Sequence, residues 1–279
     1  VDSMSHEYST PFIDNLSAAF TELELTLGPR FAARIGGRFE YSSLLDKSNA
    51  APRISLAFKT GEKSQISLAW GDFYQTPKDE FARFSPNLYY ERATHYIANF
   101  QIMKNKRIFR IETYYKDYQN LVKFDSLYSP VPADYKNDGF GHAAGIDVFW
   151  RDESIPFLDY WLSYGYIDTK RNYLDYPVEA IPTFVSSHNA RAVVKYILPK
   201  VNSLLGFTYT FASGRTYYNP NNENFLEDKT RAYHDLSFNI SYLTSIWDNF
   251  TVVYFSIGNL LDRDNIFGYR YSNQPNEQG

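Results

Sequence analysis

Side chains of two kinds alternate between Arg107 and Val122, and this alternation constrains the fold more than any other feature of the sequence. One phase is largely apolar and the other mainly charged: Phe109, Ile111, Thr113 and Tyr115 against Arg110, Glu112, Tyr114 and Lys116. Because successive side chains of a strand point to opposite faces, the stretch is predicted to be a two-faced β-strand. Its length of about 16 residues exceeds the ~5–6 residues usual for a strand of a globular protein.

The alternation recurs along the chain, which predicts an all-β fold of about twelve antiparallel strands in a single domain, residues 1–279. The connections alternate between a few residues and about ten to twenty residues. Residues 42–51 and 123–142 are expected to be two of the long loops, the second because Asn137-Asp138-Gly139 is a turn signal. Outer-membrane barrels have short turns at one end and long loops at the other, so the pattern favours an antiparallel transmembrane β-barrel.

The charged residues of the predicted strands lie almost entirely on the polar phase, with Asp72 and Asp168 as exceptions near the loop-side ends. An Arg or Lys that faces lipid at mid-membrane costs roughly 2–4 kcal/mol, so the apolar phase is expected to face lipid and the polar phase a lumen. The predicted lumen wall includes Arg34, Arg38, Arg110, Glu112, Lys116, Arg191 and Lys195. A water-soluble β-sandwich is the alternative, but its strands should be shorter and its turns less uneven.

The composition argues against several other classes of protein. Cysteine is absent, which excludes disulfides and thiolate metal sites. A net charge of −4 gives no support for nucleic-acid binding, which usually needs a basic surface. No run of ~18 apolar residues is present that could form a transmembrane helix. Aromatic residues make up 18% of the chain, as expected for a barrel with aromatic girdles at both membrane interfaces.

No catalytic residue, metal site or cofactor is expected. The five histidines are scattered without metal-ligand spacing. His234 and Asp235 are neighbours in a predicted strand, so their side chains diverge and do not form a catalytic pair. The sequence therefore favours a binding or transport protein over an enzyme.

Aromatic and arginine side chains in the predicted long loops are the best candidates for ligand contact. Aromatic faces and guanidinium groups could together hold a sugar, a metal chelate or a peptide. The alternative is that these side chains form an interfacial girdle or pack the loops on one another. The candidates are Tyr89, Tyr90, Arg92, Arg171, Tyr173, Tyr176, Arg215, Tyr217, Tyr218 and Arg231.

Seven segments resemble, in order, the later part of the barrel of TonB-dependent outer-membrane receptors. They are APRISLAF (Ala51–Phe58), WGDFYQTP (Trp70–Pro77), PNLYYERATHYIANF (Pro86–Phe100), RIETYYKDYQNLV (ending at Val122), NDGFGHAAGIDVF (Asn137–Phe149), FASGRTYYNP (Phe211–Pro220) and IGNLLDRDNIFGYRY (Ile257–Tyr271). Each is a weak pattern alone, but their order and spacing extend over nearly the whole chain.

The resemblance implies a barrel of about 22 strands, filled by an N-terminal plug through which TonB energises uptake. Plug, TonB box and final strand are not found, so the chain is expected to be a fragment with about half of the strands. It would be the wall of an active importer in the outer membrane of a Gram-negative bacterium. The implied partners are membrane lipid, the TonB complex and a scarce nutrient such as a metal chelate, cobalamin, glycan or peptide. The alternatives are a passive porin or a complete twelve-stranded barrel, either a secretion translocator or a barrel enzyme.

Overall fold

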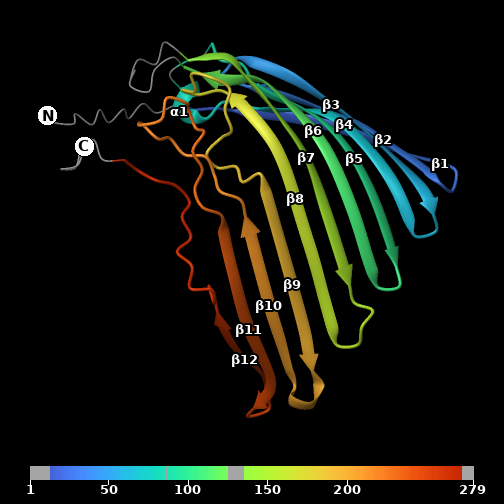
Figure 1. The fold of residues 1–279 in the computed structure, drawn as a ribbon. Helices are drawn as coiled ribbons and strands as arrows, with labels where there is room; N and C mark the ends of the chain where they lie inside the picture. The colour runs from blue at the N-terminus through green and yellow to red at the C-terminus, as the bar shows by residue number, and fades with distance from the viewer. Residues whose placement is uncertain (1–12, 84, 86, 125–134, 272–279) are drawn as a thin grey trace, which may run out of the picture.

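One curved antiparallel sheet makes up most of the computed structural model, which describes residues 13–83, 85, 87–124 and 135–271 (Figure 1). Its strands are β1 (Leu16–Leu27), β2 (Phe31–Ser42), β3 (Lys47–Gly61), β4 (Ser64–Gln75), β5 (Glu91–Lys104), β6 (Arg107–Lys123), β7 (Lys136–Asp152), β8 (Leu158–Asn172), β9 (His188–Leu198), β10 (Ser203–Ala212), β11 (Tyr233–Ile246) and β12 (Asn249–Ile257). A single helical turn, α1 (Asp79–Ala82), lies in the loop after β4. No helix among the described residues is long and apolar enough to cross a membrane.

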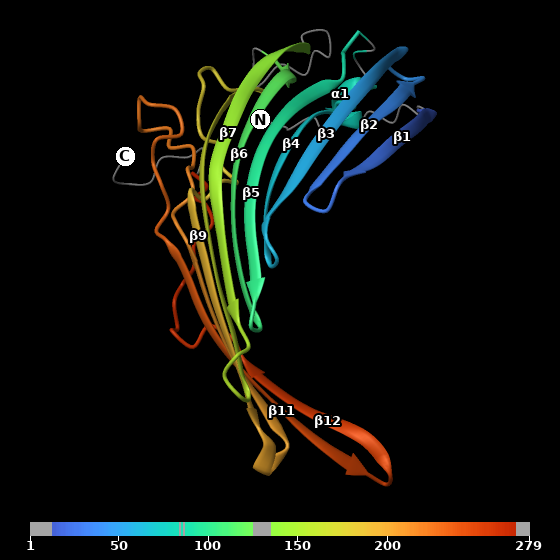
Figure 2. The ribbon, with the colours of Figure 1, turned by 90° about the vertical axis from the view of Figure 1, so that its right-hand side faces the viewer.

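Every strand pairs with its neighbours in sequence, so the sheet is a meander ordered from β1 to β12. This confirms the predicted all-β antiparallel fold. Seen from the side, the sheet is strongly curved, as a section of a barrel wall would be (Figure 2). In the part of the chain that the structure describes, β1 pairs only with β2 and β12 only with β11. The sheet is therefore open and does not form a closed twelve-stranded barrel.

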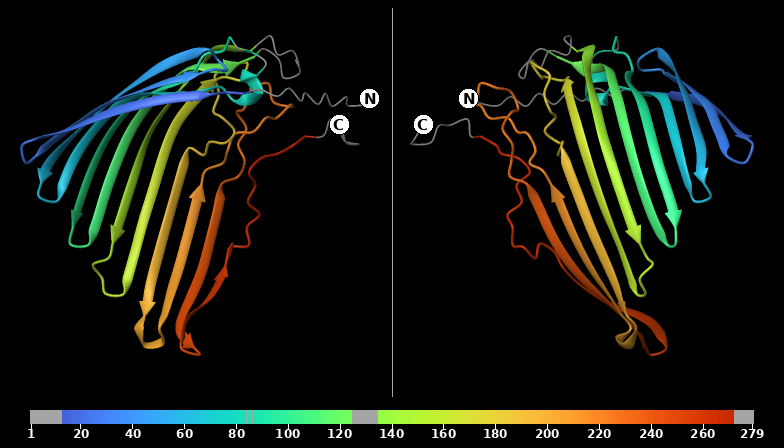
Figure 3. Two further views of the ribbon diagram at one scale, coloured as in Figure 1. Left: turned by 180° about the vertical axis from the view of Figure 1, so that it is seen from behind. Right: turned by 45° about the vertical axis from the view of Figure 1, so that its right-hand side comes forward.

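The short turns and the long loops lie at opposite ends of the sheet (Figure 3). Residues 105–106 connect β5 to β6, and residues 247–248 connect β11 to β12. At the other end, residues 76–90 connect β4 to β5 and residues 213–232 connect β10 to β11. This uneven division matches the pattern of outer-membrane barrels, in which the long loops face outward.

The apolar phase of the strands forms one continuous face. Ile54, Trp70, Tyr96 and Tyr115 lie directly opposite one another on four adjacent strands. No second layer of described residues covers this face, and Tyr96 retains 50% of its surface exposed (Figures 1 and 2). An exposed apolar face of this extent requires an apolar surrounding, which a lipid bilayer supplies.

Buried apolar side chains are concentrated at the loop end of the sheet instead of between layers. One cluster joins the β2–β3 turn, α1 and the ends of β5 and β6: Leu45, Ala82, Leu88, Tyr90 and Val122. A second cluster lies in the β8–β9 and β10–β11 loops: Tyr176, Ala180 and Leu226. The loops thus have small cores of their own, which hold them as structured units above the sheet.

Two of the predicted long loops are wrong in extent. The connection between β2 and β3 comprises only residues 43–46, because residues 47–51 pair with residues 38–42. The turn signal Asn137-Asp138-Gly139 lies inside β7, where Gly139 is paired with Leu121 across an irregular register. A Cβ at Gly139 would lie 2.7 Å from the carbonyl oxygen of Leu121, so this glycine permits a close approach of two strands.

β12 ends at Ile257. Beyond it the chain follows the upper part of β11 without forming a strand. Asn265 substitutes for a strand partner there: its Oδ1 accepts a hydrogen bond from the His234 backbone amide at 3.1 Å, and its Nδ2 donates to the His234 carbonyl at 2.9 Å. One side-chain amide therefore satisfies both backbone groups of His234, which lies beyond the part of β11 that pairs with β12.

Candidate functional site

Polar side chains form a row across the centre of the inner face, opposite the apolar face. Six residues lie directly opposite one another on strands β4 to β9: Ser67, Asn99, Glu112, Asp147, Gly165 and Asn189. Facing residues on adjacent strands are near enough to interact, so the five polar side chains form a band with a gap at Gly165 of β8. The band runs across the middle strands, so a solute that moves along the wall in the strand direction would pass it.

Two carboxylates face each other at the centre of this band. Glu112 of β6 is the direct partner of Asp147 of β7, and the Asn99 amide donates a hydrogen bond to Glu112 at 3.3 Å. Like charges directly opposite each other on a sheet are destabilising. Among the described residues, neither carboxylate has a cationic nitrogen within 4.0 Å. Their negative charge is therefore available to a group that comes from outside this part of the wall.

A concavity of about 360 Å³ opens beside the Asp147 carboxylate. Its lining on the inner face is mixed in charge and includes Arg110, Tyr114, Asp147, Phe149, Arg191 and Thr210. Gly145, the cross-strand partner of Tyr114, leaves room for the Tyr114 ring, because a Cβ at this position would overlap that ring. The wall at this point offers two guanidinium groups, one carboxylate and two aromatic rings, which can bind a ligand carrying both polar and planar groups.

Ion pairs are formed toward the margins of the inner face. On β1 and β2, Arg34 lies 3.2 Å from Glu22 and 3.0 Å from Glu24. Arg38 similarly contacts Glu40 at 2.7 Å. On β1 and β2 the charges of the inner face are thus paired within the sheet, whereas Glu112 and Asp147 are not.

Three of the predicted lumen-wall cations lie against aromatic rings. Arg110 lies 5.7 Å from the centroid of the Phe149 ring, and Lys116 lies 5.1 Å from that of Tyr114. Near the short turns, Lys195 lies 5.0 Å from the Trp161 ring. Cation–π contact of this kind leaves the charge accessible to a ligand while orienting the side chain.

The β8–β9 and β10–β11 loops pack against each other above the inner face. Tyr176 and Phe225 are in edge-to-face contact with ring centroids 5.1 Å apart. The Thr216 hydroxyl donates a hydrogen bond to the Ile181 carbonyl at 2.9 Å. Burial raises the pKa of the Tyr176 phenol well above its usual value, with neighbouring Tyr173 as a further cause. The two loops therefore behave as one packed unit.

Arg171 lies at the base of this unit, at the top of the inner face. Its guanidinium lies 4.3 Å from the centroid of the Tyr118 ring and 5.6 Å from those of Tyr173 and Phe184. Arg215, in the neighbouring loop, lies 5.3 Å from the Phe267 ring. Two arginines and several aromatic rings are thus brought together where the loops meet the lumen.

The ten loop candidates do not form one site. Tyr90 and Tyr176 are buried in separate loop clusters, while Tyr89 and Tyr218 are exposed. Arg92 lies on the apolar phase of β5, where its guanidinium contacts Asp72 at 2.9 Å. The remaining members lie in or beside the packed loop unit: Arg171, Tyr173, Arg215, Tyr217 and Arg231. Ligand contact by any of the ten stays a prediction.

Several residues of the inner-face site were not among the sequence candidates. Asp147, Tyr114, Phe149 and Asn189 are on the polar phase, but their proximity follows only from the register of β6, β7, β8 and β9. Within the described residues, no group of three or more His, Cys, Asp or Glu side chains is arranged to hold a metal ion.

Comparison with protein families identifies this wall. A family model described as "TonB dependent receptor-like, beta-barrel" matches residues 4–260. The chain belongs to this family. Family membership places the receptor barrel in the outer membrane of a Gram-negative bacterium, and since the family comprises receptors it also supports the expectation that the chain is not an enzyme.

Solved structures with the same fold are transporters and receptors of the outer membrane. The receptor barrel superimposes on the outer membrane transporter YddB from Escherichia coli with a TM-score of 0.76 at 12% identity, over 92% of this chain and 42% of that one. It matches the siderophore receptor PirA from Acinetobacter baumannii with a TM-score of 0.72 at 13% identity, over 90% and 42% of the two chains. It matches the FrpB iron transporter from Neisseria meningitidis (F3-3 variant) with a TM-score of 0.71 at 12% identity, over 90% of this chain and 41% of that one.

The receptor barrel thus spans less than half the length of each of these structures. A comparison with curated proteins gives no match.

Proposed function

We propose that this sheet forms the inner wall of an active importer, in which TonB acts through an N-terminal plug domain to open a path for a nutrient. The observation that supports this most directly is the unneutralised centre of the inner face, where Glu112 and Asp147 oppose each other beside Arg110 and Arg191. A path with groups of both signs can pass a polar solute by successive weak contacts. A passive channel selective for ions would instead show rings of one sign.

The proposed cargo is a scarce nutrient, and a metal chelate is the first class to test. Chelates combine charged oxygen atoms with planar organic groups, which guanidinium and aromatic side chains of the wall can bind. FrpB and PirA are named for iron and siderophore, which makes a ferric chelate a suitable starting probe. Cobalamin, glycans and peptides are the further members of a binding screen.

Uptake by cells that produce the intact protein tests this proposal. Radiolabelled ferric chelates are offered to cells with and without a functional TonB system, and surface binding is measured separately from accumulation. We expect binding in both strains but accumulation only where TonB is functional. Accumulation that does not depend on TonB would contradict active import and would support the passive channel.

A second experiment connects uptake to the wall. Asp147→Asn and Glu112→Gln remove the opposed charges at the centre of the path, while Glu22→Gln removes a marginal carboxylate that already pairs with Arg34. The central variants should change the rate of accumulation without abolishing surface binding, and the marginal variant should change neither. Equal effects of all three variants would count against a path along the central wall.

A further inference from the structure

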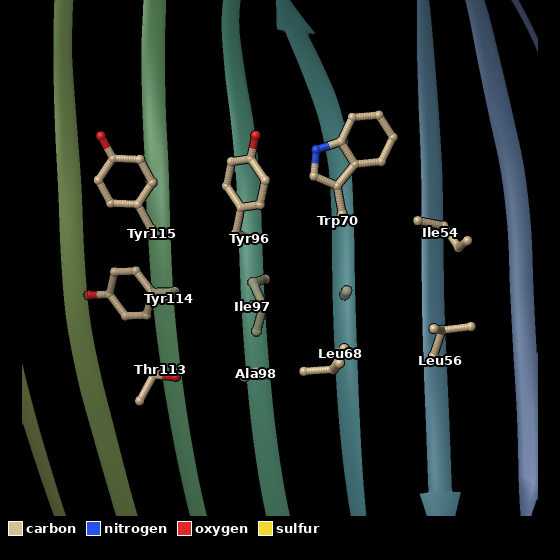
Figure 4. Close-up of a pocket in the computed structure, with 11 residues that line it drawn as sticks. Ile54, Leu56, Leu68, Trp70, Tyr96, Ile97, Ala98, Thr113, Tyr114 and Tyr115 are labelled. Atoms are coloured by element: carbon tan, nitrogen blue, oxygen red, sulfur yellow. The ribbon is translucent and has the colours of Figure 1, made fainter.

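A hollow interrupts the lipid-facing side of strands β3 to β6, away from the inner wall (Figure 4). Its volume is about 560 Å³. Eight side chains of the apolar face line it: Ile54, Leu56, Leu68, Trp70, Tyr96, Ala98, Thr113 and Tyr115. Larger side chains border the hollow along the strands in both directions.

Three consecutive cross-strand rows explain the depression. The middle row consists of Leu56, Leu68, Ala98 and Thr113, so small side chains stand on β5 and β6. The row toward the loops contains Trp70, Tyr96 and Tyr115, and the row toward the short turns contains Ile66, Phe100 and Ile111. Bulky side chains therefore border a low floor at Ala98 and Thr113 from both directions.

The aromatic row directs its two tyrosine hydroxyls to one end of the hollow, and the indole nitrogen of Trp70 faces the strand of Tyr96 (Figure 4). In Figure 4 the hydroxyl groups of Tyr96 and Tyr115 and the indole ring of Trp70 point toward the loop end of the strands. None of these three donors has a hydrogen-bond partner among the described residues. An apolar floor with free donors at one end fits a molecule that has an alkyl chain and an oxygen-rich head.

Polar groups continue beyond the aromatic row in the same direction. Thr94 follows Tyr96 on the same face of β5, and Arg92 follows Thr94. Both donate to Asp72, at 2.7 Å from the Thr94 hydroxyl and 2.9 Å from the Arg92 guanidinium. At about 3.4 Å per residue, Arg92 lies about 20 Å from the Ala98 floor. The face therefore changes from apolar to charged over a length comparable to one leaflet of a bilayer.

We propose that the hollow is a binding site for one acyl chain of an outer-leaflet lipid. The chain lies over Ala98 and Thr113, and the ester or phosphate oxygens of the lipid accept hydrogen bonds from the Trp70, Tyr96 and Tyr115 donors. The site depends on the lipid-facing orientation of these strands and is independent of the transported nutrient. Lipid therefore occupies this position for longer than it occupies the rest of the lipid-facing surface.

Photo-crosslinking in a defined bilayer tests the proposal. The intact protein is placed in phosphatidylcholine nanodiscs that contain a small fraction of phosphatidylcholine with a diazirine in the middle of one chain. After irradiation, labelled peptides are quantified by mass spectrometry. We expect peptides from the walls of the hollow to be labelled roughly threefold more than the lipid-facing peptide around Ala192. A factor of about three corresponds to the average stabilisation by one side-chain hydrogen bond between transmembrane helices.

Filling the hollow provides the matched comparison. Ala98→Phe should reduce labelling of the Leu68 and Thr113 peptides to the level of bulk contact, and Ala192→Phe, the same change on the same face of β9, should leave it unaltered. Thr113→Leu fills the hollow from β6 if Ala98→Phe does not assemble. Uniform labelling of the lipid-facing strands, or labelling that persists when the hollow is filled, would overturn the proposal.

Discussion

Glu112 on β6 and Asp147 on β7 are direct cross-strand partners on the inner face of the sheet, although both are acidic. Folding alone does not favour this arrangement, since like charges that face each other across a sheet are destabilising. The only hydrogen bond that the described residues donate to the pair comes from Asn99. The arrangement is explained if the two carboxylates bind a solute, or another part of the protein that contacts the wall.

Removing one of the two carboxylates should stabilise the sheet. We expect Glu112→Gln or Asp147→Asn to raise the free energy of unfolding by roughly 0.2–1 kcal/mol, the usual size of a cross-strand interaction. The double variant should gain little more than either single variant, because one change already ends the repulsion. Unfolding by guanidinium in lipid vesicles provides the measurement. A loss of stability in both single variants would show that each carboxylate has a stabilising partner.

The Arg92–Asp72 pair at the loop-side end of the apolar face should behave in the opposite way. The Asp72 side chain is 8% exposed and accepts hydrogen bonds from Arg92 and Thr94. Asp72→Ala would leave the guanidinium unpaired on the lipid-facing phase, at a cost of about 1–3 kcal/mol. Replacing both partners by leucine should recover most of this loss. A double variant as unstable as Asp72→Ala would contradict the interpretation.

The alternation of side chains predicted the strands and their faces well, because it arises from the two solvents on either side of the wall. It predicted the loop-side ends poorly. Residues 47–51 and 136–142 were expected in loops, yet they belong to β3 and β7. A strand that extends beyond the membrane meets water on both faces, so its sequence is free of alternation and resembles a loop. Asp72 is charged although it lies on the apolar phase, and its place near the loop-side end, where the strand passes from lipid to water, explains this.

The candidate site was predictable only in part. The charged phase predicted that Arg110, Glu112 and Lys116 share one face of β6, which agrees with the register of that strand. It did not indicate that Glu112 would face Asp147, because the register of two strands separated by a long loop is not contained in either strand alone. The loop aromatics show the other limit: Tyr90 and Tyr176 have the composition of a binding surface, but the structure buries them in the loop cores.

Alkaline pH should loosen the packed loop unit through Tyr176. Burial raises the pKa of this phenol above its usual value of about 10. A group whose pKa is raised by folding contributes its full stability below its ordinary pKa of about 10 and loses that contribution progressively as the pH rises from there toward the raised pKa of the folded state. Limited proteolysis of the β8–β9 loop by an alkaline-active protease should therefore accelerate between pH 9 and about 11. In Tyr176→Phe the acceleration should be smaller, and an unchanged pH dependence would exclude Tyr176 as its cause.

The most direct test of the central claim, that this wall separates lipid from a polar lumen, compares the same substitution at two adjacent positions. Ile111→Arg places a charge on the lipid-facing phase, and Glu112→Arg places it on the inner face beside Asp147. In guanidinium unfolding from lipid vesicles, Ile111→Arg should lower stability by roughly 2–4 kcal/mol. Glu112→Arg should change stability by less than about 1 kcal/mol, since it can pair with Asp147. Equal losses in the two variants, or a larger loss for Glu112→Arg, would contradict the assignment of the two faces.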